Sequence, residues 1–234
     1  MKPGPFALLA ALMLALPAQA HARAFRVGVS GYSDGQTVAG TRYALVADES
    51  QRQASAFEFP EYARHVERAL ATRNMVRVAD PAGADVIIYV GYGVGDPVKH
   101  SESTPNARFL PVQTGVTTTQ MTPTGQLVQV PETTMRWVGS GSTTTEWTTY
   151  DRWLRLSAVD AAEQRQSGKN RERWHMDIKS TGDSDDLRLV MPYMTYSASK
   201  YIGLDTGHAL EIKVKEKDKG YLEYIAAPLA GPAQ

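Results

Sequence analysis

The residues that could support hydrolytic chemistry are the histidines and the serines and carboxylates near them. His175 precedes Asp177 by two positions, and Ser30 lies in the segment Gly28-Val29-Ser30-Gly31-Tyr32. A nucleophilic serine needs a histidine that a carboxylate orients, and the Ser30 segment lacks the last glycine of a nucleophile elbow. We expect His175 to be a solvated histidine on the polar face of a strand, and Ser30 to end the first strand.

Two further segments match known ligand-binding motifs only in part. Gly91-Tyr92-Gly93-Val94-Gly95 follows an apolar run, but the spacing and the following helix of a dinucleotide fingerprint are missing. Asp183-Ser184-Asp185-Asp186 lacks the glycine and the distal glutamate of a calcium loop and fits a helix cap. The chain has no cysteine, which excludes thiolate zinc sites. We predict no cofactor, no metal and no catalytic residue.

The tryptophans are the best candidates for a binding surface. Trp147 and Trp153 lie in a polar, threonine-rich setting, and we predict that they form a patch for a partner, since aromatic anchors favour interfaces. Trp174 alternates with polar neighbours and is expected in the core. Trp137 is the fourth tryptophan of the chain.

The first twenty residues have the order of an export signal. Lys2 precedes an apolar run from Phe6 to Leu16, and Ala18-Gln19-Ala20 follows. The run is shorter than the roughly 20 residues of a membrane-spanning helix. We therefore predict a signal peptide over 1–20, cleaved after Ala20 or after Ala22, and a periplasmic location. Because cysteine is absent, we predict no lipid anchor.

The charge balance narrows the classes of partner. The chain has 25 basic and 25 acidic residues, which leaves a formal net charge of zero. A neutral chain without a polybasic cluster gives no electrostatic basis for binding nucleic acid or anionic lipid. We expect no nucleic acid and no integral membrane segment, and an envelope protein or cell-wall component as the partner.

Hydrophobic periodicity predicts an α+β fold. We expect a two-layer sandwich, with a mostly antiparallel sheet and two helices on one face, in a single domain over residues 21–227. The run at 86–90 is continuously apolar and predicts a strand buried on both faces. The other strands are expected over 25–29, 41–46, 76–78, 147–159, 174–179, 210–215 and 221–225, and the helices over 61–73 and 185–202.

The segment 97–146 differs from the rest in composition. It is rich in Thr, Ser, Gly and Pro, poor in charge, and shows no sustained hydrophobic period. We predict a long, polar, Thr-rich inserted loop that carries short hairpins, and the best strand candidates within it are 126–130 and 135–138. Residues 164–170 are expected to form a polar turn, and residues 228–234 a loose tail.

Several landmarks of the chain resemble those of one bacterial family. They are Tyr43-Ala44, Phe59, Val66, Leu70, the segment 84–88, the threonine run into Tyr150, the segment 154–160 and Trp174. The family is a set of cell-envelope domains catalogued as domain-of-unknown-function family four-one-three-six, often lipoproteins. The resemblance implies an envelope location and an α/β sandwich, and no activity. This chain departs from the pattern in lacking the lipid-bearing cysteine, in its long middle segment and in an added hairpin after Gly203.

These observations favour a non-catalytic binding or structural protein of the envelope. One alternative is a hydrolase with an unrecognised Ser, His and Asp site, which needs His100 or His175 within hydrogen-bond reach of a carboxylate and a serine. The other alternative is a small-ligand carrier, which needs a closed apolar pocket between helices and sheet.

Overall fold

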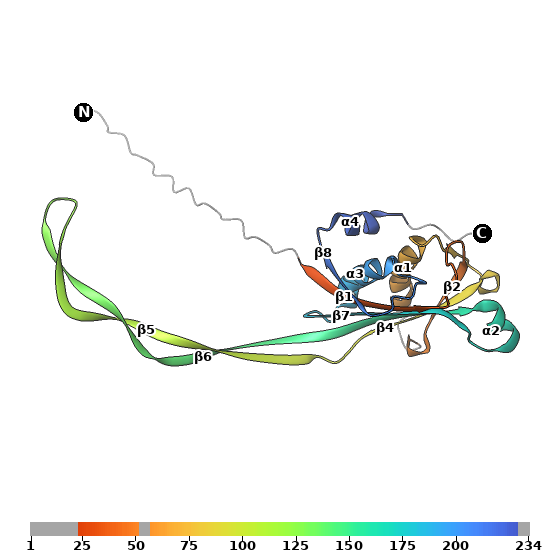
Figure 1. The fold of residues 1–234 in the computed structure, drawn as a ribbon, viewed down its shortest axis with the longest axis horizontal. Helices are drawn as coiled ribbons and strands as arrows, with labels where there is room; N and C mark the ends of the chain where they lie inside the picture. The colour runs from red at the N-terminus through yellow and green to blue at the C-terminus, as the bar shows by residue number, and fades with distance from the viewer. Residues whose placement is uncertain (1–22, 52–56, 229–234) are drawn as a thin grey trace, which may run out of the picture.

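The structure, a computed structural model, describes residues 23–51 and 57–228. The predicted signal peptide (1–20) and nearly all of the predicted tail (228–234) lie outside these residues. The described chain forms an eight-stranded sheet and four α-helices (Figure 1). In chain order the elements are β1 (Ala24–Ser33), β2 (Arg42–Ala47), α1 (Glu58–Ala71), β3 (Val76–Arg77), β4 (Val86–Val94), β5 (Val98–Met121), β6 (Leu127–Asp160), α2 (Ala161–Ser167), β7 (Glu172–Gly182), α3 (Leu187–Ser199), β8 (Leu210–Lys215) and α4 (Lys219–Ala226).

The sheet is open and mostly antiparallel, as the periodicity predicted. Its strand order is β3-β2-β4-β6-β7-β1-β8, and β5 pairs with β6 outside this row. Only β2 runs parallel to its neighbours β3 and β4 among the paired strands of the described chain. The mixed α+β class is therefore confirmed.

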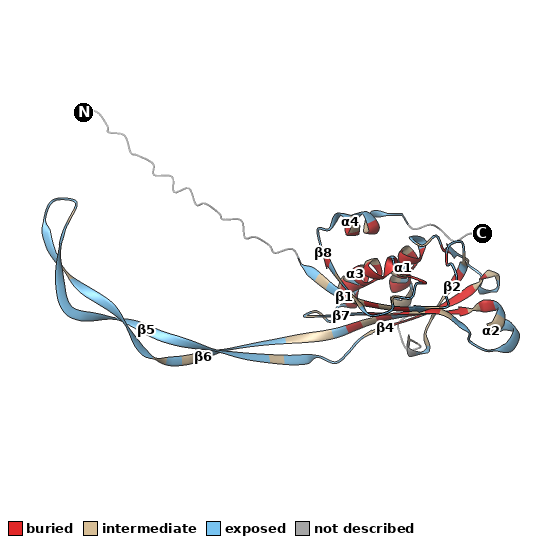
Figure 2. Cartoon of the chain, in the orientation of Figure 1, coloured by how far each residue is buried: buried red, intermediate tan, exposed pale blue. Residues whose placement is uncertain are grey.

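The main core lies between one face of the sheet and the helices α1 and α3 (Figure 2). Leu154, Leu156 and Ala158, which were expected to share a face, are each at most 1% exposed. Ile88 of β4 is fully buried beside them. Removing these aliphatic side chains from water supplies the main driving force for this layer.

Two segments predicted as a strand and a turn are helices instead. Residues 221–225 belong to α4, whose Tyr221 and Tyr224 lie three positions apart and are both buried. Most of residues 164–170 belong to α2, which Asp160 caps and Gly168 ends in a left-handed conformation. Short β-prone or polar runs carry no clear period, so tertiary packing decides their state.

The helices are consequently arranged differently from the prediction. Three of them, α1, α3 and α4, lie on one face, whereas two were expected (Figure 1). The short α2 packs through Ala161 on the opposite face against Ile87 and Val159. Asp186, the last residue of the predicted cap segment, caps α3 by accepting a hydrogen bond from Arg188 N. Within residues 23–51 and 57–228, no helix combines the length and the hydrophobicity that crossing a membrane requires.

The segment predicted as a loop over 97–146 is a long β-hairpin. Its strands pair from Val98 opposite Thr149 to Met121 opposite Leu127, and we call this hairpin the arm. It extends away from the sheet, and its side chains are almost all exposed (Figure 2). The prediction was wrong because a strand exposed on both faces has no buried side, so its sequence needs no alternation of apolar and polar residues.

Candidate functional sites

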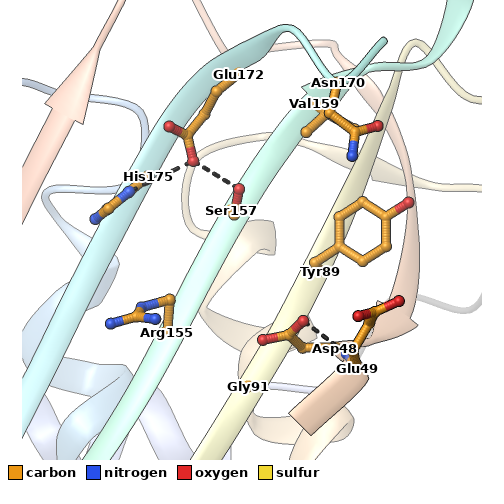
Figure 3. Close-up of a pocket in the computed structure, with 10 residues that line it drawn as sticks. All are labelled: Asp48, Glu49, Tyr89, Gly91, Arg155, Ser157, Val159, Asn170, Glu172 and His175. Carbon is orange, nitrogen blue, oxygen red and sulfur yellow. Dashed lines mark hydrogen bonds and ion pairs between the residues drawn. The ribbon is translucent and has the colours of Figure 1, made fainter. Parts of the chain in front are cut away.

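The sheet face away from α1 and α3 carries a polar cluster from β6 and β7. In the register of these strands, Ser157 lies opposite His175, and Arg155 lies opposite Asp177. Alternate side chains of a strand project from the same face. The four side chains therefore lie together. Glu172 at the start of β7 joins them and lies between Ser157 and His175 (Figure 3).

The hydrogen bonds in this cluster do not form a nucleophilic triad. Ser157 Oγ donates to Glu172 Oε1 at 2.6 Å. His175 Nδ1 lies 3.4 Å from the same oxygen, and His175 Nε2 lies 3.0 Å from Asp177 Oδ2. Both imidazole nitrogens thus face carboxylate oxygens, and neither is directed at the serine hydroxyl, as a general base must be.

Arg155 completes the cluster by binding the second carboxylate. Its Nε donates to Asp177 Oδ1 at 3.0 Å. Partial burial opposes ionisation of Asp177, but the hydrogen bonds from Arg155 and His175 outweigh it and hold the pKa of this carboxyl below its ordinary value. His175 was expected to be solvated, yet it is half-buried and held on both sides.

A surface hollow of about 610 Å³ adjoins this cluster. Four residues of the cluster line it, and Asp177 does not. The wall is completed by other residues that include Asp48, Glu49, Tyr89 and Asn170 (Figure 3). In the part of the chain that the structure describes, no group of three or more histidine or carboxylate side chains is placed to hold a metal ion. The arrangement suits hydrogen bonding to a polar group better than covalent chemistry.

The two tryptophans predicted as one patch occupy different parts of β6. Trp147 lies on the arm, is 43% exposed and stacks on His100 at 5.3 Å between ring centroids. Trp153 lies in the sheet against Gly93, where an added Cβ would come within 2.8 Å of the indole ring. The two residues are six positions apart along the strand, which places them roughly 20 Å from each other.

The arm carries an apolar surface that the sequence reasoning missed. Phe109 pairs with Trp137, and Pro111 pairs with Met135, two positions along on the same face. We call these four residues the distal patch. Phe109, Trp137 and Met135 are 50%, 60% and 64% exposed. The sequence shows that these four residues are apolar. Their pairing depends on the register between β5 and β6, which joins positions that are distant in the chain. Trp174 is buried in the core, as predicted.

The fold and these surfaces define an α+β domain with a projecting two-stranded arm. Comparisons with protein-family models and with curated proteins find no match. Among solved structures, a PDZ domain protein from Parabacteroides distasonis aligns with 82% of this chain and 39% of its own, at 13% identity and a TM-score of 0.36. The lysenin pore aligns with 83% of this chain and 49% of its own, at 9% identity and a TM-score of 0.10. The chain spans less than half of either protein, and scores this low assign neither fold nor function.

Proposed function

We propose that this chain is an exported, non-catalytic protein of the bacterial periplasm that binds or organises an envelope partner through its arm. The observation that carries the proposal is the distal patch. It exposes aromatic and thioether side chains on a hairpin that contributes nothing to the core. Contiguous exposed apolar residues of this kind are typical of interaction sites.

The stability of the arm supports the same proposal. A two-stranded ribbon in water is only marginally stable, whereas further strands or a packed face stabilise it. The arm pairs over more than twenty positions of β5, and no other helix or strand of the described residues covers it (Figure 1). Contact with a partner would bury one face and stabilise the ribbon.

The charges of the arm favour an apolar contact over electrostatic attraction. Three basic and three acidic residues are spread along it: Lys99, Arg108, Arg136, Glu102, Glu132 and Glu146. Their balance leaves no field of one sign to draw a charged partner. The export-signal pattern and the resemblance to family four-one-three-six support the envelope location and remain part of the proposal.

A shortened arm tests the proposal. Ser103 lies opposite Thr144, so residues 104–143 can be replaced by Asn-Gly, a two-residue hairpin turn. We expect the shortened protein to be exported and to unfold at the same temperature as the full chain. In cells, a photo-crosslinking residue at Trp137 should capture an envelope partner, and the same residue at Leu222, exposed on α4, should not.

Two results would overturn the proposal. One is an arm-shortened protein that retains every partner of the full chain. The other is equal capture from the Trp137 and Leu222 positions. The location is tested separately, because protein that stays in the cytoplasm with residues 1–20 still attached contradicts export.

A further inference from the structure

A second hollow lies between the ends of α1 and α3 and the helix α4, on the side of the sheet opposite the polar cluster. Its volume is about 630 Å³, within the roughly 300–1,000 Å³ of small-molecule sites. Three cationic side chains line it: Arg68, Arg73 and Lys200. The rings of Tyr196 and Tyr224 form part of its wall, and none of its lining residues is acidic.

Among the described residues, no acidic side chain neutralises the positive charges of this hollow. Within the described residues, no carboxylate forms an ion pair with Arg68, Arg73 or Lys200. The Nε of Arg68 is buried and has no hydrogen-bond partner in the described chain, and its guanidinium lies 5.9 Å from the centroid of the Tyr224 ring. The buried Nε is closed to a ligand, so Arg68 would bind a carboxylate or phosphate group through its outer Nη atoms.

The acidic residues near the hollow are engaged elsewhere. Asp218 accepts a hydrogen bond from Gly220 N as the cap of α4. Glu223 lies 3.7 Å from Lys219 on the same helix. Neither residue lines the hollow, so a bound anion would meet a net positive wall.

Helix dipoles explain only part of this arrangement. Cations are favourable near helix C-termini, and Arg73 Nε donates to the carbonyl of Ile202 just beyond α3. The helix dipole accounts for one basic residue near the C-terminus of each helix. It does not account for three such side chains lining the same hollow as two tyrosine rings.

The walls of the hollow are held by contacts between the three helices. Tyr224 Oη donates to the carbonyl of His65, which joins α4 to α1. Thr72 Oγ1 lies 3.4 Å from the carbonyl oxygen of Ser199, which joins α1 to α3. Tyr196 approaches α4 so closely that a Cβ at Gly220 would lie 2.7 Å from its hydroxyl. A site held in this way loses little entropy on binding.

We infer that this hollow binds a small molecule that carries a carboxylate or phosphate group on a planar apolar body. Arg68, Arg73 and Lys200 bind the oxyanion, and the planar body lies against Tyr196 and Tyr224. A free small molecule and the headgroup of an anionic lipid share this chemistry. The site is independent of the arm and of the function proposed for it.

Calorimetric titration of the full chain with phenyl phosphate tests the inference. We expect saturable one-to-one binding, and an affinity at least about tenfold weaker in Lys200→Gln and in Arg73→Gln, because each removes a charge-assisted contact. Lys219→Gln, on α4 outside the lining, is the matched control and should bind as the original chain does. Inorganic phosphate should bind more weakly than phenyl phosphate, because it lacks the planar body.

The source of the oxyanion is distinguished by a second probe. Co-sedimentation with phosphatidylglycerol vesicles that depends on Arg73 and Lys200, without binding of phenyl phosphate, would assign the site to a lipid headgroup. Absence of binding to both probes overturns the inference. Binding that Lys200→Gln and Arg73→Gln leave unchanged overturns it as well. Because the arm-shortened protein retains this hollow, it should bind phenyl phosphate normally whatever the fate of its protein partner.

Discussion

Ser157 and His175 lie directly opposite each other on β6 and β7, yet both contact Glu172 rather than each other. The serine hydroxyl donates to Oε1 of that carboxylate, and Nδ1 of the imidazole lies near the same oxygen. The carboxylate therefore accepts the hydrogen bond that the imidazole would accept in a Ser-His-Asp triad. This arrangement ties two strands together and pairs the serine hydroxyl with a carboxylate instead of the imidazole of a Ser-His-Asp triad.

The first prediction concerns pH. The pKa of the Asp177 carboxyl is lower in the folded state than in the unfolded state. The ionised carboxylate therefore stabilises the folded protein fully at pH values above the unfolded-state pKa of this carboxyl. This contribution is lost as the pH falls through the folded-state pKa. Asp177→Asn should lower the free energy of unfolding at neutral pH by about 1 kcal/mol, and by less at acidic pH. Chemical denaturation across pH measures this difference.

The control for that prediction is Asp96→Asn. Asp96 is exposed and forms no ion pair in the described residues. A loss of stability that is equal at neutral and acidic pH in Asp177→Asn would contradict the assignment.

The second prediction separates the core from the arm. Ile88 is fully buried, whereas Trp137 is 60% exposed. Ile88→Ala should reduce the free energy of unfolding by about 2–5 kcal/mol, because it leaves a cavity. Trp137→Ala should change it by less than about 0.5 kcal/mol. Urea denaturation compares them, and similar losses in both variants would show that the arm packs on the domain.

The third prediction uses the contact between Gly93 and Trp153. A Cβ at position 93 would lie 2.8–2.9 Å from three atoms of the indole ring. Gly93→Ala should therefore destabilise the protein by about 1–3 kcal/mol through overpacking. In the Trp153→Ala background the same change should cost much less. Thermal unfolding of the four proteins in this cycle measures the coupling, and additive effects would refute the close contact.

The fourth prediction concerns exchange of backbone amides. The amides of β4 lie in the centre of the sheet, between β2 and β6, and should exchange slowly. Those of residues 104–143 lie in a ribbon without a packed face and should exchange many times faster. Mass-spectrometric hydrogen exchange tests this, and equal protection of β4 and the arm in the isolated protein would contradict it. Partner binding should slow exchange around the distal patch.

Several elements could be read from local pattern, because each of them buries at least one face. The alternation of Leu154, Leu156 and Ala158 predicted a half-buried strand, and the run Val86–Val90 predicted a central one; both are present. The helix predicted over 61–73 is α1, which begins three residues earlier at Glu58. Burial imposes a period of two on a strand and of 3.6 on a helix, and that period survives in the sequence.

The arm, α4 and the polar cluster could not be read in this way. The arm has no buried face to impose a period, and α4 packs its Tyr221 ring on Tyr193 of α3, a partner that is distant in the sequence. Ser157 and Glu172 are brought together by strand register, which joins positions that are distant in the chain. The hollow with Arg68, Arg73 and Lys200 likewise depends on three separate helices.

The sequence by itself determined the α+β class, the central strands and the core positions, since each follows from the residues that a local element must bury. The tertiary structure alone decided that the threonine-rich segment is a projecting arm rather than a loop, and that Ser157 and His175 share a carboxylate. These features depend on pairing between distant residues, and local hydrophobicity does not encode pairing.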